Sequence, residues 1–298
     1  MAEHDKQHIV PQAYLKRFTF SKKEPLKVYT MKKADHKIFP ANISDSAEEN
    51  NFYTMPNSDD PFYVEKHFSD KVEPILSNVI SEIEKYACCC LIQNYSVVLT
   101  DEMKENLVYS IVNQLIRDNN ARDLMKRVIE RSFEPTFYSI RSKYPLTNIE
   151  ITDINKEEFA RETSILVPFN AYGLEKVVDE LRSRIYVIGR IIDDDNEFIT
   201  SDSPVMVMNY QTLDVTPFNI GINSINAIIL YPITPKLIVM GYHRLFKERY
   251  NIDGRISFFD NEEKKMLIIA NNKKQLEHCY RFVYSRKREI LEEISRLP

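Results

Sequence analysis

The sequence predicts an α+β fold, with a helical amino-terminal half packed with a mostly antiparallel β-sheet from the carboxyl-terminal half and closed by carboxyl-terminal helices. Residues 62–143 carry apolar side chains at spacings of three and four, the period of amphipathic helices. Residues 184–240 contain short segments rich in Ile, Val and Tyr between turn residues, as is typical of strands. Because helices and strands do not alternate regularly, a doubly wound sheet is not expected.

The first eighteen residues combine apolar anchors with chemically versatile side chains, which is unusual for a chain terminus. Pro11 biases Val10 toward an extended backbone and can occupy the first turn of a helix. Tyr14 and Phe18 are four residues apart and would share one face of that short helix. We therefore expect this segment to pack against the helical region, with His8 just before the helix begins.

The next elements are a hairpin and a long helix. Strands at residues 24–31 and 37–39 are separated by a polar turn and predict a β-hairpin. Residues 51–54 are expected to form a short extended piece. Residues 62–93 have a helical period throughout, and Pro74 should kink or interrupt this helix because proline has no backbone N–H to donate.

A second long helix should begin after Thr100, whose hydroxyl can cap it ahead of two acidic residues. Away from its apolar stripe this helix carries Gln114 and Arg117. That face could be solvated or could line an internal cleft, and both interpretations stay open. The helical pattern resumes at Leu124 and continues toward residue 143.

Shorter elements fill the second half of the chain. Residues 144–155 predict a connection, and two short helices are expected at 156–164 and 174–183. A last helix is predicted over residues 260–285. The predicted strands lie between the short helices and the last helix, at residues 184–192, 197–200, 205–209, 227–231 and 236–240.

A chain of 298 residues suits one large domain or two closely packed ones. We expect one domain over residues 1–298, with a subdivision as the alternative. The subdivision would place a mainly helical lobe with an amino-terminal hairpin in residues 1–145 and an α+β lobe in residues 146–298.

Composition excludes several classes of function. The net charge of −4 argues against a protein that coats nucleic acid through general electrostatic attraction. The five glycines are never close together, which excludes a Walker A loop and the glycine fingerprint of dinucleotide-binding proteins. No apolar run approaches 18 residues and no signal peptide is apparent, so we expect a cytoplasmic protein without a membrane span.

Metal and disulfide sites find little support in the sequence. Three of the four cysteines, at positions 88–90, are consecutive and lack the spacing of a structural zinc site, so buried or half-buried thiols are expected. His4 and His8 have a metal-binding spacing, but Pro11 disfavours a regular helix there. The acidic run at residues 193–196 predicts a hairpin turn, with a carboxylate metal cluster as the alternative. The remaining histidines are solitary and are expected to be structural or at the surface: His36, His67, His243 and His278.

The amino-terminal pattern H-x-x-P-x-x-Y-L-x-x-F, which begins at His8, resembles the opening of a bacterial domain-of-unknown-function family numbered 4238. Further matches follow in the family's order and extend the resemblance over most of the chain. They are Asn51-Phe52-Tyr53, Glu65, Gln114 with Arg117, Ser201-Asp202-Ser203-Pro204, and Tyr231-Pro232-Ile233-Thr234-Pro235. The resemblance supplies candidate positions and no reaction.

These positions suggest a candidate site. His8 could act as a general acid or base because its ordinary pKa lies nearest neutrality, and Glu65 or Asp202 could be a second proton-transfer group or a ligand for a divalent metal. Arg117 could hold a phosphate or carboxylate through two parallel hydrogen bonds. The remaining candidates would orient a substrate: Gln12, Tyr14, Asn51, Tyr53, Gln114 and Ser201.

Two classes of function follow. The first is a cytoplasmic bacterial hydrolase, a nuclease or phosphoesterase that acts on nucleic acid or a nucleotide, with a role as a toxin or in phage defence. The second is a non-enzymatic interaction module whose polar residues form a structural network. Clustering of the family positions around a concave pocket would favour the enzyme, and solid packing would favour the module. Neither the cofactor nor the oligomeric state follows from the sequence.

Overall fold

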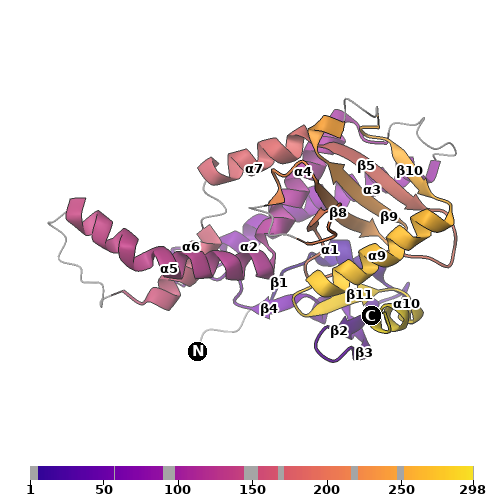
Figure 1. The fold of residues 1–298 in the computed structure, drawn as a ribbon. Helices are drawn as coiled ribbons and strands as arrows, with labels where there is room; N and C mark the ends of the chain where they lie inside the picture. The colour runs from indigo at the N-terminus through magenta and orange to yellow at the C-terminus, as the bar shows by residue number, and fades with distance from the viewer. Residues whose placement is uncertain are drawn as a thin grey trace.

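The computed structural model has the predicted α+β fold, with helices concentrated in the amino-terminal half and two sheets that draw most of their strands from the rest of the chain (Figure 1). The helices α5 and α6 project together away from the sheets. The described residues are 6–56, 58–89, 98–143, 154–166, 171–215, 221–246 and 252–297.

The amino-terminal segment packs into the protein, as its apolar spacing predicts. It contains the strand β1 (Lys6–His8), the helix α1 (Gln12–Leu15) and a 3-10 turn (Lys16–Phe18). Tyr14 and Phe18 are each at most 1% exposed, and the Tyr14 ring stacks on Tyr231 at a centroid distance of 5.4 Å. The segment thus joins the helical layer to the larger sheet, which contains Tyr231.

The long helices follow the predicted apolar stripes. Thr100 caps its helix as expected, because its Oγ1 accepts a hydrogen bond of 3.2 Å from the Met103 amide. The predicted interruption near Pro74 is a π-helical turn directly before α3. The helices of this half are α2 (Tyr63–His67), the π-turn (Phe68–Val72), α3 (Glu73–Cys89), α4 (Asp101–Ile116) and α5 (Asn119–Lys143). The second half begins with α6 (Lys156–Leu166) and α7 (Ala171–Ser183).

The larger sheet has the order β10-β5-β9-β8-β7 and is antiparallel except for the pair β10–β5. All eight residues of β8 are buried, because helices cover both faces of this strand. One face packs on α3 and α4 in the main core, and the other lies beneath α9. The strands are β5 (Ile185–Ile191), β7 (Met206–Asn209), β8 (Ala227–Thr234), β9 (Leu237–Tyr242) and β10 (Ile256–Phe259).

The smaller sheet unites distant parts of the sequence in the antiparallel order β3-β2-β11-β6. The predicted hairpin forms its β2–β3 edge, with Lys27 opposite Asn42. A separate two-stranded ladder pairs β1 with β4. The strands and helices of this region are β2 (Lys27–Lys32), β3 (Ile38–Asn42), β4 (Glu48–Asn50), β6 (Thr200–Ser201), β11 (Phe282–Ser285), α9 (Glu262–His278) and α10 (Arg288–Ser295).

Several local predictions are wrong. The helix predicted over residues 260–285 ends at His278, and the chain then enters β11, because its apolar residues pair with β2 and β6. The turn at residues 193–196 is not a hairpin, since β5 and β6 belong to different sheets. Residues 51–54 form a turn after β4, and Asn51 has a positive φ of 53°.

Two further predictions concern cysteine and the membrane. Cys279 is buried as expected, whereas Cys88 and Cys89 are exposed near the end of α3, and Cys90 lies outside the described residues. His4 and most of the 144–155 connection also lie outside them. In the part of the chain that the structure describes, no helix has the length and hydrophobicity to cross a bilayer.

Candidate functional site

Arg117, at the carboxyl end of α4, is the centre of the polar residues that the amino-terminal pattern predicts. Its side chain is 1% exposed and lies 4.5 Å from the centroid of the Phe68 ring. The guanidinium donates to the Tyr53 hydroxyl over 3.2 Å, to Glu73 Oε1 over 3.1 Å and to the backbone carbonyl of His8. All three guanidinium nitrogens therefore have protein partners.

Two glutamine side chains hold the backbone beside Arg117. Gln114 donates to the Ile9 carbonyl over 3.2 Å. Gln7 accepts a hydrogen bond from the Tyr53 amide and donates to Thr54 Oγ1 over 3.1 Å. Both glutamines are nearly fully buried, so their contacts fix the entry of the amino-terminal segment into the core.

The His8 ring lies at the edge of this network. Its Nε2 is 3.2 Å from the Ser44 carbonyl oxygen and 3.0 Å from the side-chain nitrogen of Gln12, which is itself exposed. Burial lowers the pKa of His8, so its neutral form is favoured at pH 7. Arg117 contacts the backbone carbonyl of this residue rather than its ring.

The remaining amino-terminal candidates are also tied into the fold. The Tyr14 hydroxyl is 2.7 Å from Thr200 Oγ1 and donates to the Pro232 carbonyl.

Burial alone would lower the pKa of Arg117, but Tyr53, Glu73 and Glu65 together raise it. The structure thus brings Glu65, Tyr53 and Arg117 into one electrostatic group.

Asp202 and Ser201 contact a different part of the chain. Asp202 is 1% exposed and accepts hydrogen bonds of 2.8, 2.7 and 3.0 Å from the backbone amides of residues 280–282. Burial raises the pKa of Asp202 to about 6 although these three amides favour its charged form. Ser201 Oγ donates to Gln275 Oε1 over 2.7 Å, so both side chains hold β6 against β11 and α9.

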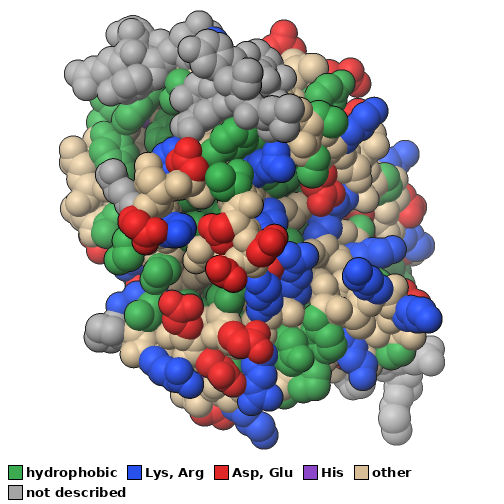
Figure 2. Space-filling model, turned by 90° about the vertical axis from the view of Figure 1, so that its right-hand side faces the viewer, with side chains coloured by type: hydrophobic (Ala, Val, Ile, Leu, Met, Phe, Trp, Pro, Cys, Tyr) green, Lys and Arg blue, Asp and Glu red, His purple; other side chains and the backbone are tan. Residues whose placement is uncertain are grey.

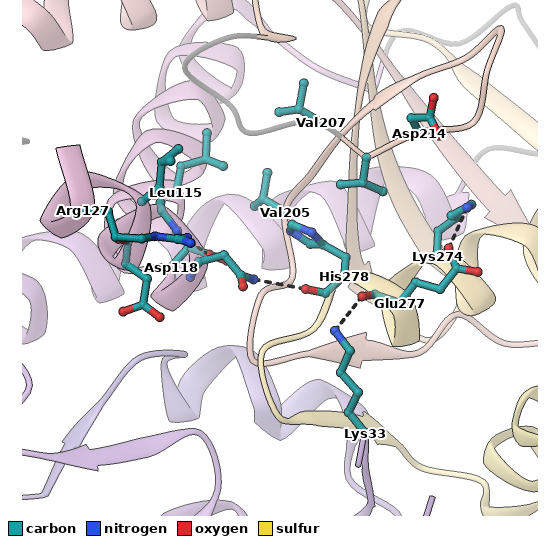
Figure 3. A pocket seen from close by; sticks show the side chains of 15 residues that line it. Lys33, Leu115, Asp118, Arg127, Val205, Val207, Asp214, Lys274, Glu277 and His278 are labelled. Atoms are coloured by element: carbon teal, nitrogen blue, oxygen red, sulfur yellow. Dashed lines mark hydrogen bonds and ion pairs between the residues drawn. The ribbon is translucent and has the colours of Figure 1, made fainter. Parts of the chain in front are cut away.

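A cavity of about 520 Å³ lies where the start of α5, the strand β7 and the end of α9 meet (Figure 3). Its polar walls contain side chains that the sequence did not single out as a group. They are Lys33, Asp118, Asn120, Asp123, Arg127, Asp214, Lys274, Glu277 and His278. The described part of the chain contains no cluster of three or more His, Cys, Asp or Glu side chains arranged to hold a metal.

Asp118 is held rigidly in the wall of this cavity. It precedes α5, and its Oδ1 caps the helix by accepting bonds of 2.7 and 3.1 Å from the amides of Asn120 and Ala121. The hydroxyl of Ser203 donates to the same carboxylate, and burial raises the pKa of Asp118. The cap fixes the direction of the carboxylate while it faces His278.

His278 is the last residue of α9 and the electrostatic partner of Asp118. Its ring donates to the Val205 carbonyl, and burial lowers the pKa of His278 although Asp118 acts in the opposite direction. Figure 3 shows the ring next to Val205, on the side of the cavity opposite Arg127. A neutral ring that donates through one nitrogen keeps a lone pair on the other, as a general base requires.

Hydrogen bonds hold the segments that carry Asp118 and His278 in place. The side-chain amide of Asn120 donates to Ser203 Oγ and to the His278 carbonyl, each over 3.1 Å. Lys33 reaches the same turn and donates over 2.7 Å to the carbonyls of Glu277 and Cys279. These contacts join α5, the connection between β6 and β7, and the residue after β2 to the end of α9.

Three cations line the cavity. Lys33 and Lys274 already donate hydrogen bonds to protein atoms, and Lys274 donates to Glu277 Oε2 over 2.6 Å. Arg127 is exposed, and its Nε donates to the Asp123 carbonyl over 3.1 Å. Figure 3 shows its guanidinium extending toward Asp118. The cations could receive an anionic group next to the His278 ring.

One sequence signal could have revealed Asp118. Asp118-Asn119-Asn120 between two helical stretches is a capping pattern, and it marks the boundary between α4 and α5. His278 gave no comparable signal, because its partner lies 160 residues earlier and its neighbours fit a helix that was expected to continue.

A family model described as "Protein of unknown function (DUF4238)" matches residues 6–289. No curated protein and no solved structure matches the chain significantly.

Proposed function

The chain belongs to the DUF4238 family, and for it we propose a hydrolase that cleaves a phosphate ester of a nucleotide in the cavity beside His278. The observation that carries this proposal is that the fixed Asp118 carboxylate and the His278 ring line one cavity and act on each other electrostatically. Asp118 is the positioning residue and His278 is the general base.

The proposed reaction is addition of water to phosphorus. A water oxygen forms a bond to phosphorus while the ester P–O bond breaks. His278 takes one proton from the water, and the departing alcohol oxygen, on the opposite side of phosphorus, takes a proton from solvent. His278 then releases its proton to solvent, so the products are the alcohol and a phosphate. Asp118 stabilises the imidazolium that forms between these transfers.

The size of the cavity and three basic side chains in its wall support a small phosphorylated substrate, and four carboxylates share that wall: Asp118, Asp123, Asp214 and Glu277. A volume of about 520 Å³ is in the range of pockets that take single small molecules. Lys33, Arg127 and Lys274 can balance the charge of a phosphate, and Arg127 can donate two parallel hydrogen bonds to it. On the face shown in Figure 2, basic and acidic side chains are interleaved, which does not suit a long nucleic acid there.

The candidate residues outside the cavity support a second function. Arg117, Gln114 and Asp202 use their polar atoms largely on the protein backbone, as a structural network does. This observation favours a non-enzymatic interaction module for that part of the molecule. The hypothesis that His8, Glu65 and Asp202 are catalytic then competes with the His278 proposal and predicts a different set of inactive variants.

Turnover assays separate these hypotheses. Purified wild type would be tested on p-nitrophenyl phosphate, bis(p-nitrophenyl) phosphate, nucleoside phosphates and RNA. His278→Gln should lower kcat by at least about 100-fold, the usual contribution of a general base. Asp118→Asn keeps a good helix cap but loses the charge, so it should lower kcat while the helix stays capped.

The matched control is His8→Gln, which makes the same change outside the cavity. It should keep wild-type turnover, and urea unfolding should show that all three variants fold. Wild type that turns over none of these substrates, or His278→Gln with wild-type kcat, would contradict the proposal. Growth arrest on induction of wild type but not of His278→Gln would support a toxin or phage-defence role.

A further inference from the structure

The four carboxylates in the wall of the 520 Å³ cavity differ in whether a protein donor already uses them. Asp118 caps α5, and Asp123 Oδ2 accepts from a tyrosine hydroxyl over 3.2 Å. Glu277 pairs with a lysine over 2.6 Å. The Asp214 carboxylate has no hydrogen bond or ion pair with any residue that the structure describes, and Asp214 is exposed. A ligand in the cavity can therefore reach this carboxylate and donate hydrogen bonds to it.

The basic side chains of the wall divide in the same way. Lys33 and Lys274 already donate to protein oxygens. Arg127 donates to a backbone carbonyl through its Nε, and its two terminal nitrogens have no acceptor among the described residues. Figure 3 draws Arg127 at one end of the cavity and Asp214 at the other, beyond the His278 ring. The cavity thus offers a free cation at one end and a free acceptor at the other.

The wall between these two ends is apolar. Val205 and Val207 are at most 3% exposed and lie between Arg127 and Asp214 in Figure 3. Valine side chains can pack on the face of a flat ring but give its polar edge no partner. A nucleobase has apolar faces and carries its hydrogen-bonding atoms on its edge. This order of groups suits a nucleotide with its phosphate at Arg127 and its base edge at Asp214.

A free carboxylate distinguishes the bases, because it accepts hydrogen bonds and donates none when ionised. Guanine presents its N1–H and its 2-amino group side by side, so one carboxylate can accept from both. Adenine and cytosine each present one amino donor beside a ring-nitrogen acceptor, and uracil presents one N–H between two carbonyl oxygens. In these three bases an acceptor would face the carboxylate, which is unfavourable.

We propose that the cavity is specific for a guanine nucleotide, whose base donates two hydrogen bonds to Asp214. This inference rests on the phosphate-ester hydrolase proposed above and adds the base that the enzyme recognises. Asp214 is then the specificity-determining residue, and it takes no part in proton transfer.

Calorimetric titration with nucleoside monophosphates tests the base preference without turnover. Wild type should bind GMP at least about tenfold more tightly than AMP, the discrimination expected of a bidentate pair. IMP lacks the 2-amino group and should bind with an affinity between the two. Asp214→Asn replaces one acceptor oxygen with an NH₂ donor, so it should bind XMP, which has a carbonyl in place of the 2-amino group, more tightly than GMP.

Two controls accompany this titration. Asp195→Asn makes the same change at an exposed position outside the cavity and should keep the preference for GMP over AMP. Inorganic phosphate should bind wild type and Asp214→Asn equally, because Asp214 lies away from the phosphate end. Urea unfolding checks that both variants fold, and the wild-type comparison of GMP with AMP decides the question if Asp214→Asn does not.

Equal binding of GMP and AMP to wild type, or a preference for GMP that survives in Asp214→Asn, overturns the guanine inference. Neither result affects the hydrolase proposal, which depends on the turnover of wild type and His278→Gln. Wild type that binds neither nucleotide nor inorganic phosphate contradicts both proposals.

Discussion

Arg117 and Asp118 are consecutive residues with opposite surroundings, and the two regions they enter differ in what their polar atoms can still do. Arg117 enters a packed network in which its guanidinium contacts Tyr53, Glu73 and a backbone carbonyl. Asp118 enters a cavity in which it faces His278. Both residues are buried, so burial does not distinguish them.

Chemistry requires polar side chains that border open space, as those around the Asp118 cavity do. In the Arg117 network the polar side chains make their hydrogen bonds largely to the backbone. These bonds stabilise one arrangement of the amino-terminal segment. In the Asp118 cavity one carboxylate oxygen accepts from the amides at the start of α5, Ser203 donates to the same carboxylate, and the His278 ring lines the open space. The first region should therefore respond to mutation in stability and the second in activity.

The largest stability effect is expected for Arg117→Met. The change leaves Glu73 and the His8 carbonyl without their buried donor, and loss of one member of such a pair costs about 3–5 kcal/mol. Urea unfolding measures it. The matched control is Arg127→Met, because this exposed arginine should change the unfolding free energy by less than about 0.5 kcal/mol. Equal effects in the two variants would contradict the comparison.

Asp202→Ala should cause the second-largest loss of stability. It removes the acceptor for three backbone amides and should cost about 2–4 kcal/mol at pH 5. Folding raises the pKa of Asp202 from 3.8 to about 6, so its contribution is complete below 3.8 and is lost as the pH rises through 6. The stability difference between wild type and variant should thus shrink from pH 4 to pH 7. A difference that grows over this range would contradict the assignment.

His8→Ala should have the smallest effect, less than about 1 kcal/mol. The ring makes contacts only at the edge of the network, and the carbonyl that Arg117 uses is retained. Turnover should be unchanged. Loss of activity with an unchanged unfolding free energy would instead support the hypothesis that His8 is catalytic.

Much of the fold could be predicted because its signals are local. The period of the long helices, the Thr100 cap and the apolar runs of β5, β8 and β9 depend on neighbouring residues. The strand β11 could not be predicted in the same way, because its conformation depends on pairing with β2 and β6, more than 80 residues away in sequence. Burial of Tyr14 and Phe18 followed from their spacing.

The candidate site was harder to predict than the fold. The family pattern indicated Gln114 and Arg117, whose side chains are buried as the cleft interpretation required, but against protein partners. The pair of Asp118 and His278 joins the start of α5 to the end of α9, and sequence periodicity carries no information about such a contact. The sequence therefore indicated the packed region more readily than the open one.

An NMR pH titration of the histidine rings, with and without inorganic phosphate, tests directly whether His278 is the general base beside an anion site, and the His278→Gln variant assigns its resonance. We expect a His278 midpoint below 6.5, because burial lowers its pKa. Phosphate should raise that midpoint, since a bound anion favours the imidazolium, and should leave His8 unchanged. A His278 midpoint at or above 6.5 without phosphate, or a His278 resonance that phosphate does not move, would rule out this role for His278.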